Sequence, residues 1–155
     1  MKIEQPEIAW AKAYLNGIIS RWKWVEIYQM QLERLQEQLI TYGGGGLGEK
    51  VQSSPMGDAL EKRVIKFVSD VTELKLKFYD QLDAANERQK EASARIMCLK
   101  VGKCQDILLD HYVRQISFTD LANAYGYDSE LSIYKLHERA IRYFAEVAKE
   151  NGWIY

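Results

Sequence analysis

Polar side chains recur on one face of a segment near the C-terminus that reads SELSIYKLHERAIRYF, residues 129–144. Apolar residues three and four positions apart, Ile133, Leu136 and Ala140, predict a helix with that apolar row turned inward. The opposite face then presents the polar residues Glu130, Ser132, Tyr134, Lys135, Glu138 and Arg139. A glutamate can accept a hydrogen bond from cytosine N4, and a lysine can donate to guanine O6 and N7. This face could therefore contact base pairs, or it could be an ordinary solvated helix surface.

A second short helix and a tight turn precede this segment. The stretch FTDLANAY, residues 118–125, carries an apolar row, and Ser117 is placed to cap its start. Gly126 can adopt the positive φ that ends a helix in a tight turn, and Ser129 is placed to cap the next helix. Together with residues 104–113, CQDILLDHYV, the pattern predicts three short helices with a sharp turn between the last two. This is the plan of a helix-turn-helix, and two core helices that meet at a glycine would give the same spacing.

The C-terminal pattern resembles region four of sigma factors, whose recognition helix has the apolar spacing of residues 129–144. The chain as a whole resembles the phage-encoded RinA- and ArpU-like late-gene transcriptional regulators. The resemblance depends on the loop from Val51 to Pro55 and on the run Tyr-x-Leu-His-x-x-Ala from Tyr134 to Ala140. The N-terminal part is matched mainly by its helical character. One departure is an extra residue in the turn after Gly126, so the recognition helix is expected to start later or to be rotated.

The resemblance implies a phage or prophage protein that binds double-stranded promoter DNA sequence-specifically and regulates transcription in the cytoplasm of a bacterial host. The residues implied to contact DNA are, for the bases, Glu130, Ser132, Tyr134 and Lys135, and, for the phosphates, Arg139 and Arg142. The alternative is an adaptor or inhibitor that uses a sigma-like helical surface to bind a protein, without direct contact to DNA. A DNA-recognition subunit of a packaging machine, assembled as a ring, is a third hypothesis.

The charge of this region argues against easy DNA binding. Six Lys or Arg residues stand against seven Asp or Glu residues between Lys103 and Lys149, and the whole chain has a formal net charge of −1. Affinity for DNA comes largely from neutralising phosphates, so a nearly neutral domain must concentrate its few cations. We therefore expect weak or assisted binding, in which host RNA polymerase or a second copy of the chain holds the protein on the promoter.

Two long amphipathic helices are predicted before the C-terminal helices. The first covers residues 6–42, and the second covers residues 58–100, with Asp58 as its cap. Apolar residues of the second helix follow alternating steps of four and three, which indicates a coiled-coil seam. Between the helices, GGGGLGEKVQSSPMGD, residues 43–58, predicts a flexible linker or a loop that orders on binding. Each glycine there would cost a helix about 1 kcal/mol relative to alanine.

We therefore predict an all-α protein. Residues 1–100 form a long antiparallel, coiled-coil-like helical hairpin with its glycine-rich loop at 43–58, and residues 101–155 form a three-helix helix-turn-helix domain. Neither long helix can bury its apolar stripe alone, so a parallel intermolecular pair is the alternative to the hairpin. Trp24 cannot share a helix face with Trp22, and an exposed tryptophan would suit a contact with another protein or protomer. We expect a homodimer.

Enzyme, metal and membrane functions find no support in the sequence. His111 and His137 lack partners at metal-ligand spacing, so we expect packed or hydrogen-bonded histidines. Cys98 and Cys104 are six residues apart and are predicted to be free thiols in a reducing compartment. The N-terminal residues do not resemble a secretion signal, and no stretch approaches the roughly 20 apolar residues of a membrane span. We expect a cytoplasmic protein that is not an enzyme, takes no cofactor and does not contact membranes.

Overall fold

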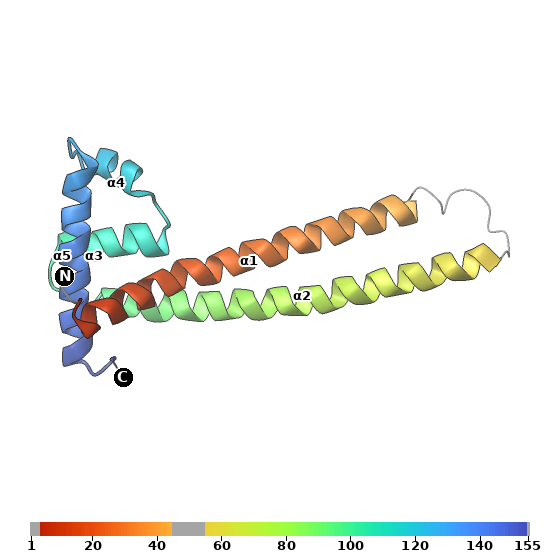
Figure 1. The fold of residues 1–155 in the computed structure, drawn as a ribbon, viewed down its shortest axis with the longest axis horizontal. Coiled ribbons are helices and arrows are strands. Elements are labelled where there is room, and N and C mark those ends of the chain that lie inside the picture. The colour runs from red at the N-terminus through yellow and green to blue at the C-terminus, as the bar shows by residue number, and fades with distance from the viewer. Residues whose placement is uncertain (1–3, 45–54, 155) are drawn as a thin grey trace. The chain divides into compact units, whose positions relative to one another are not determined.

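The computed structural model describes residues 4–44 and 55–154, and all regular structure in these ranges is helical (Figure 1). The predicted all-α fold class is confirmed. The elements in chain order are α1 (Pro6–Gly44), α2 (Pro55–Ile96), α3 (Gly102–Leu108), the π-helical segment η1 (Leu109–Val113), α4 (Phe118–Ala124) and α5 (Glu130–Glu150).

Both long helices extend into the sequence that was expected to form a loop. α1 continues to Gly44, and α2 already begins at Pro55, so Asp58 lies in the first turn of α2 and is not its cap. Proline is well suited to the start of a helix, because the N–H that it lacks would have no partner there. The remainder of the predicted loop, residues 45–54, lies outside the described residues. It includes all of the Val51–Pro55 loop of the family resemblance except Pro55.

The chain divides into two compact units whose limits cut across both long helices. The head unit contains the described residues up to Arg21 and from Ala85 onward, and the hairpin unit contains those within Trp22–Ala84. The start of α1 belongs to the head unit because Trp10 and Tyr14 stack on Phe144 of α5, with ring centroids 6.2 and 5.9 Å from that of Phe144. The start of α1 thus packs with the C-terminal helices, while the division into domains 1–100 and 101–155 stays a prediction.

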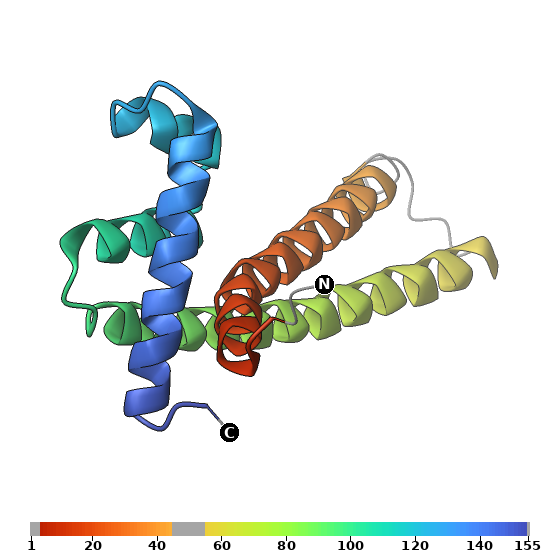
Figure 2. The same cartoon turned by 60° about the vertical axis from the view of Figure 1, so that its left-hand side comes forward.

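The helices α1 and α2 run antiparallel within the hairpin unit. Leu35 of α1 lines a groove with Leu74 of α2, whereas Leu39, further along α1, meets residues earlier in α2, among them Phe67 and Val64. The two ribbons also run side by side in opposite directions in both views (Figures 1 and 2). An intramolecular hairpin therefore partly covers the inner apolar rows, and a parallel pairing with a second chain is not needed for that purpose.

Five elements contribute to the core of the head unit. The side chains that are less than 2 % exposed include Leu15, Ile18, Ile96, Ile107, Leu108, Leu121, Ile133, Ile141 and Phe144. They come from α1, α2, α3, α4 and α5, so the helix-turn-helix is held by helices distant in sequence. Burial of apolar side chains is the dominant favourable term in folding, and this core fixes the position of α5.

Candidate nucleic-acid interface

A tight turn joins α4 to α5. Gly126 has a φ of 74°, as predicted, and the N–H of Tyr127 donates to the carbonyl of Ala122 at 2.9 Å. This hydrogen bond, with a second from the Gly126 N–H to the Asn123 carbonyl, closes the end of α4 in a left-handed C-terminal turn. A residue with a Cβ would be strained at this φ, so glycine is the residue that the turn requires.

Ser117 and Ser129 differ in their capping roles. The Ser117 hydroxyl accepts a hydrogen bond from the Asp120 N–H at 3.2 Å, so the predicted cap of α4 is confirmed. Ser129 is the N-cap residue of α5, as predicted, with the extended backbone of that position, but its side chain accepts no such hydrogen bond. Glu130 places a carboxylate in the first turn of α5, where it interacts favourably with the helix dipole.

The inward face of α5 is the one predicted from the apolar spacing. Ile133, Leu136, Ala140, Ile141 and Phe144 are all buried. The six residues proposed to contact DNA are accessible to different degrees. Glu130, Lys135, Arg139 and Arg142 are exposed, Tyr134 is 44 % exposed, and Ser132 is half-buried.

Three of the predicted DNA-contacting residues are brought together on one side of α5. Lys135, Arg139 and Arg142 line a shallow groove, and Glu138 and Glu146 line it with them. Three cations within about two turns of one helix form a surface that could hold phosphate oxygens. The two carboxylates beside them reduce the positive potential of this surface, in line with the expectation of weak or assisted binding.

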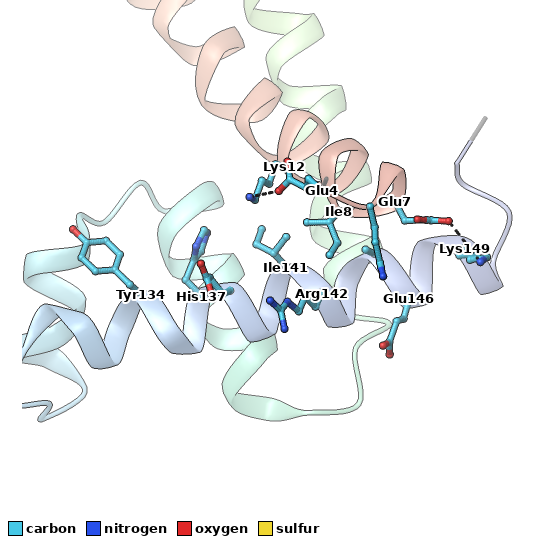
Figure 3. Close-up of a pocket in the computed structure, with 13 residues that line it drawn as sticks. Glu4, Glu7, Ile8, Lys12, Tyr134, His137, Ile141, Arg142, Glu146 and Lys149 are labelled. Carbon is cyan, nitrogen blue, oxygen red and sulfur yellow. Dashed lines mark hydrogen bonds and ion pairs between the residues drawn. The ribbon is translucent and has the colours of Figure 1, made fainter. Parts of the chain in front are cut away.

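Tyr134 and Arg142 also line a larger open groove within the head unit, between α5 and the start of α1 (Figure 3). Ile8 and Ile141 contribute apolar side chains to this groove. Its charges are mixed, because Lys12 pairs with Glu4, and the Lys149 Nζ lies 3.6 Å from a carboxylate oxygen of Glu7. Since these cations already have carboxylate partners, the groove offers little uncompensated positive charge to a phosphate backbone.

Glu130 makes contacts inside the helix-turn-helix. Its Oε1 accepts a hydrogen bond from the Thr119 hydroxyl of α4 at 2.5 Å, and its Oε2 lies 3.4 Å from the Tyr134 hydroxyl. The Tyr134 ring also packs edge-on against Phe118 at 5.2 Å. These contacts connect the start of α4 to the first turns of α5, so Glu130 can orient the exposed face as well as accept from a base.

Leu131 is an exposed residue of α5 that sequence reasoning missed. It lies in the first helical turn and is 60 % exposed. The available signal was its position two residues before Ile133, because residues two apart do not share a helix face. An apolar side chain at the start of a helix that enters the major groove can contact the methyl group of thymine.

The two histidines form part of a packed cluster in which η1, α4 and α5 meet, as expected. The Tyr112 hydroxyl lies 2.6 Å from His137 Nε2, and the His111 Nδ1 donates to the Ile116 carbonyl at 2.8 Å. The His111 ring stacks on Phe118 with centroids 3.9 Å apart. Burial, with smaller contributions from His111 and Lys12, lowers the pKa of His137 to about 4. His137 is therefore neutral at pH 7 and can accept from Tyr112.

The described part of the chain shows no sign of a metal site. These residues contain no group of three or more His, Cys, Asp or Glu side chains that could hold a metal ion. Cys98 and Cys104 are both free thiols, as predicted, and burial raises the pKa of the Cys104 thiol. No helix among the described residues has the length and apolar character needed to cross a membrane.

Comparison of the chain with protein-family models, with curated proteins and with solved structures finds no match. The resemblance to RinA- and ArpU-like regulators and to sigma region four therefore remains an expectation from the sequence.

Proposed function

We propose that the protein is a sequence-specific DNA-binding transcriptional regulator of the phage or prophage type, which contacts double-stranded promoter DNA through α5. The observation that carries the proposal is the exposed outer face of α5, held behind α4 by a tight turn. In helix-turn-helix proteins the second helix enters the major groove, and its N-terminal residues contact base edges. In this chain those residues include Tyr134 and Lys135, both exposed.

The proposed roles divide along the length of α5. Lys135 donates to a guanine, and Tyr134 contacts a neighbouring base edge, with Glu130 and Ser132 as further base contacts near the start of the helix. Arg139 and Arg142 follow one and two turns later and bind phosphates, which fixes the register of the helix on the duplex. The contact between Glu130 and Thr119 holds the first turn of α5 in place for these contacts.

The proposed binding is weak unless it is assisted. Glu138 and Glu146 lie among the cations of the α5 groove, so few phosphates can be neutralised. Host RNA polymerase or a second copy of the chain would supply the missing affinity on a promoter in the bacterial cytoplasm. A homodimer would place two copies of α5 on half-sites about one helical turn of DNA apart. The mass of the purified protein in sedimentation measures whether a dimer forms.

DNA binding by the full chain across a salt series tests the proposal, with fragments taken from beside its own gene. We expect affinity to fall steeply as salt rises, and Arg139→Ala to reduce the slope of log K against log salt by about one. Lys135→Ala should cost about 1–3 kcal/mol on the preferred sequence and relax specificity at one base pair. Lys103→Ala removes an exposed lysine from the start of α3 and serves as the matched control.

The second candidate function is a protein-binding adaptor or inhibitor that uses the sigma-like surface without DNA. The mixed-charge groove between α1 and α5 in the head unit favours it, because ion pairs and an apolar floor suit a protein partner better than a polyanion. Absence of DNA binding at low salt would reject the regulator proposal and support this second function.

A further inference from the structure

A second apolar row lies on the surface of the hairpin unit. The outer stripe consists of Ile65, Val68, Thr72, Leu76 and Tyr79 of α2. Its four large side chains are 62, 49, 63 and 55 % exposed in that order. The Thr72 hydroxyl donates to the carbonyl of Val68 at 2.8 Å, so it needs no outside partner. The steps of three and four residues give the stripe the spacing of a helix-packing face about 21 Å long.

The inner row of α2, which faces α1, consists of Val64, Phe67, Val71, Leu74 and Phe78. The outer stripe is rotated around the helix axis from this inner row by one residue, about 100°. Thr72 follows the buried Val71, and Tyr79 follows the half-buried Phe78. The same one-residue step on α1 leads from Val25 to Glu26. Because the helices are antiparallel, equal rotations from their inner rows point to the same side of the hairpin.

A groove on the other side supports this geometry. Gln31 of α1 and Asp70 and Lys77 of α2 line it together. Each of these residues stands one position before an inner-row residue. On both helices, the residues that precede the inner row by one position therefore lie on the same side of the hairpin. The residues that follow the inner row by one position therefore lie on the opposite side, which carries the outer stripe.

Carboxylates surround the outer stripe. On α1, three glutamates follow inner-face residues by one position and therefore lie beside the outer stripe. They are Glu26, Glu33 and Glu37. On α2 itself, Glu61 lies four residues before the stripe and Asp83 lies four residues after it. All five side chains are exposed, and the exposed basic residues Lys62 and Lys75 also lie next to the stripe. This side of the hairpin therefore combines an apolar helix-packing row with a negative border.

We propose that this side of the hairpin unit binds a basic amphipathic helix of another protein. The apolar row of the partner packs on the outer stripe, and its Lys or Arg residues face the carboxylates, as in helix-in-groove recognition. The border disfavours a second copy of the same surface, since glutamates would then face glutamates, and it repels DNA and anionic lipid. The inference does not depend on DNA binding by α5.

The test measures binding of synthetic helical peptides to the full chain at low ionic strength by fluorescence anisotropy. The probe is a peptide of about 15 residues, the length of the stripe, with leucines at helical spacing and flanking lysines. One matched peptide carries glutamates in place of the lysines, and another has the same composition with the leucines off the helical period. We expect the first peptide to bind and both matched peptides to bind at least about tenfold more weakly.

Variants of the chain locate the surface. Leu76→Gln removes an exposed apolar side chain without a large change in helix propensity, and Glu33→Lys reverses one border charge. Each variant should bind the lysine peptide about tenfold more weakly than the natural chain does. Asp70→Lys makes the same charge change at a residue that lines the opposite groove, and should leave binding within about twofold.

Three outcomes would overturn the proposal. The first is no binding of the lysine peptide at low salt, and the second is equal binding of the acidic or off-period peptide. The third is a concentration-dependent mass in sedimentation that Leu76→Gln abolishes, because a second copy would then occupy the stripe. Each result is independent of the DNA measurement, so this proposal and the proposed function can fail separately.

Discussion

The head unit and the hairpin unit bury their apolar side chains to very different extents. The head unit encloses a core drawn from five helices, with Phe144 and Ile133 fully buried. In the described part of the hairpin unit, Val25 and Val71 are the buried hydrophobic side chains, while Leu76 and Ile65 stay exposed. A unit that completes its core is suited to hold a surface rigidly, whereas one that leaves an apolar row exposed gains from a partner. The difference separates a proposed reading surface on α5 from a proposed docking surface on α2.

The largest expected effect compares one phenylalanine in each unit. Phe144→Ala should destabilise the protein by about 3–5 kcal/mol, because the ring is fully buried, stacks on Trp10 and Tyr14 and contacts the tilted ring of Trp153. Phe78→Ala in the hairpin removes a half-buried ring and should cost about half as much. Urea unfolding of both variants measures the free energies. Equal losses would contradict the contrast between the two units.

The next effect concerns pH and belongs to the head unit alone. The pKa of His137 is lowered to about 4, chiefly by burial, while an unfolded histidine has a pKa near 6.5. The unfolded chain therefore binds more protons between these values, so the stability that His137 contributes is complete above about pH 6.5 and is lost toward pH 4. The loss should reach at most about 3 kcal/mol.

His137→Gln provides the control for this prediction, because a glutamine carbonyl can still accept from the Tyr112 hydroxyl and does not titrate. Denaturant unfolding at pH 7 and at pH 4.5 should show a smaller loss for the variant than for the natural chain. An identical loss in both proteins would mean that His137 does not titrate below its ordinary range.

A smaller effect is expected at the turn between α4 and α5. Gly126→Ala meets no atom within 4 Å, so its cost comes from the positive φ of 74° and should be about 1–2 kcal/mol. Gly102→Ala, at the start of α3, has the same open surroundings without a positive φ and should be close to neutral. Thermal unfolding compares the two variants, and equal shifts would argue against strain at the turn.

The smallest effect tests the contact that orients the start of α5. Thr119→Val removes the hydroxyl that donates to Glu130 and should cost about 0.5 kcal/mol, because the hydrogen bond is exposed. If this contact orients α5 for DNA binding, the variant should lose more free energy of DNA binding than free energy of unfolding. Unchanged DNA affinity in Thr119→Val would remove Glu130 from the positioning role.

The sequence was sufficient to predict features that depend on local spacing. The apolar rows of the long helices, the inward face of α5 and the turn at Gly126 follow from periodicity and backbone preference, and the structure has all three. Ser117 was a correct cap for the same reason.

Features that depend on distant contacts were not predictable in this way. Trp10 gave no sign that it would stack on Phe144, more than 130 positions later, so the packing of α1 with the C-terminal helices was missed. The exposure of Leu131 and the outer stripe on α2 emerge only when the inner faces of the helices are known. The contacts to DNA stay a prediction.

The salt dependence of DNA binding tests the division of roles between the two units most directly. Arg139→Ala removes a cation from the exposed face of α5, and Arg63→Ala removes an exposed cation from α2 in the hairpin unit. If α5 contacts DNA and the hairpin does not, Arg139→Ala lowers the slope of log K against log salt by about one while Arg63→Ala leaves it unchanged. No salt-dependent binding by the natural chain, or an equal change in both variants, would contradict the proposal.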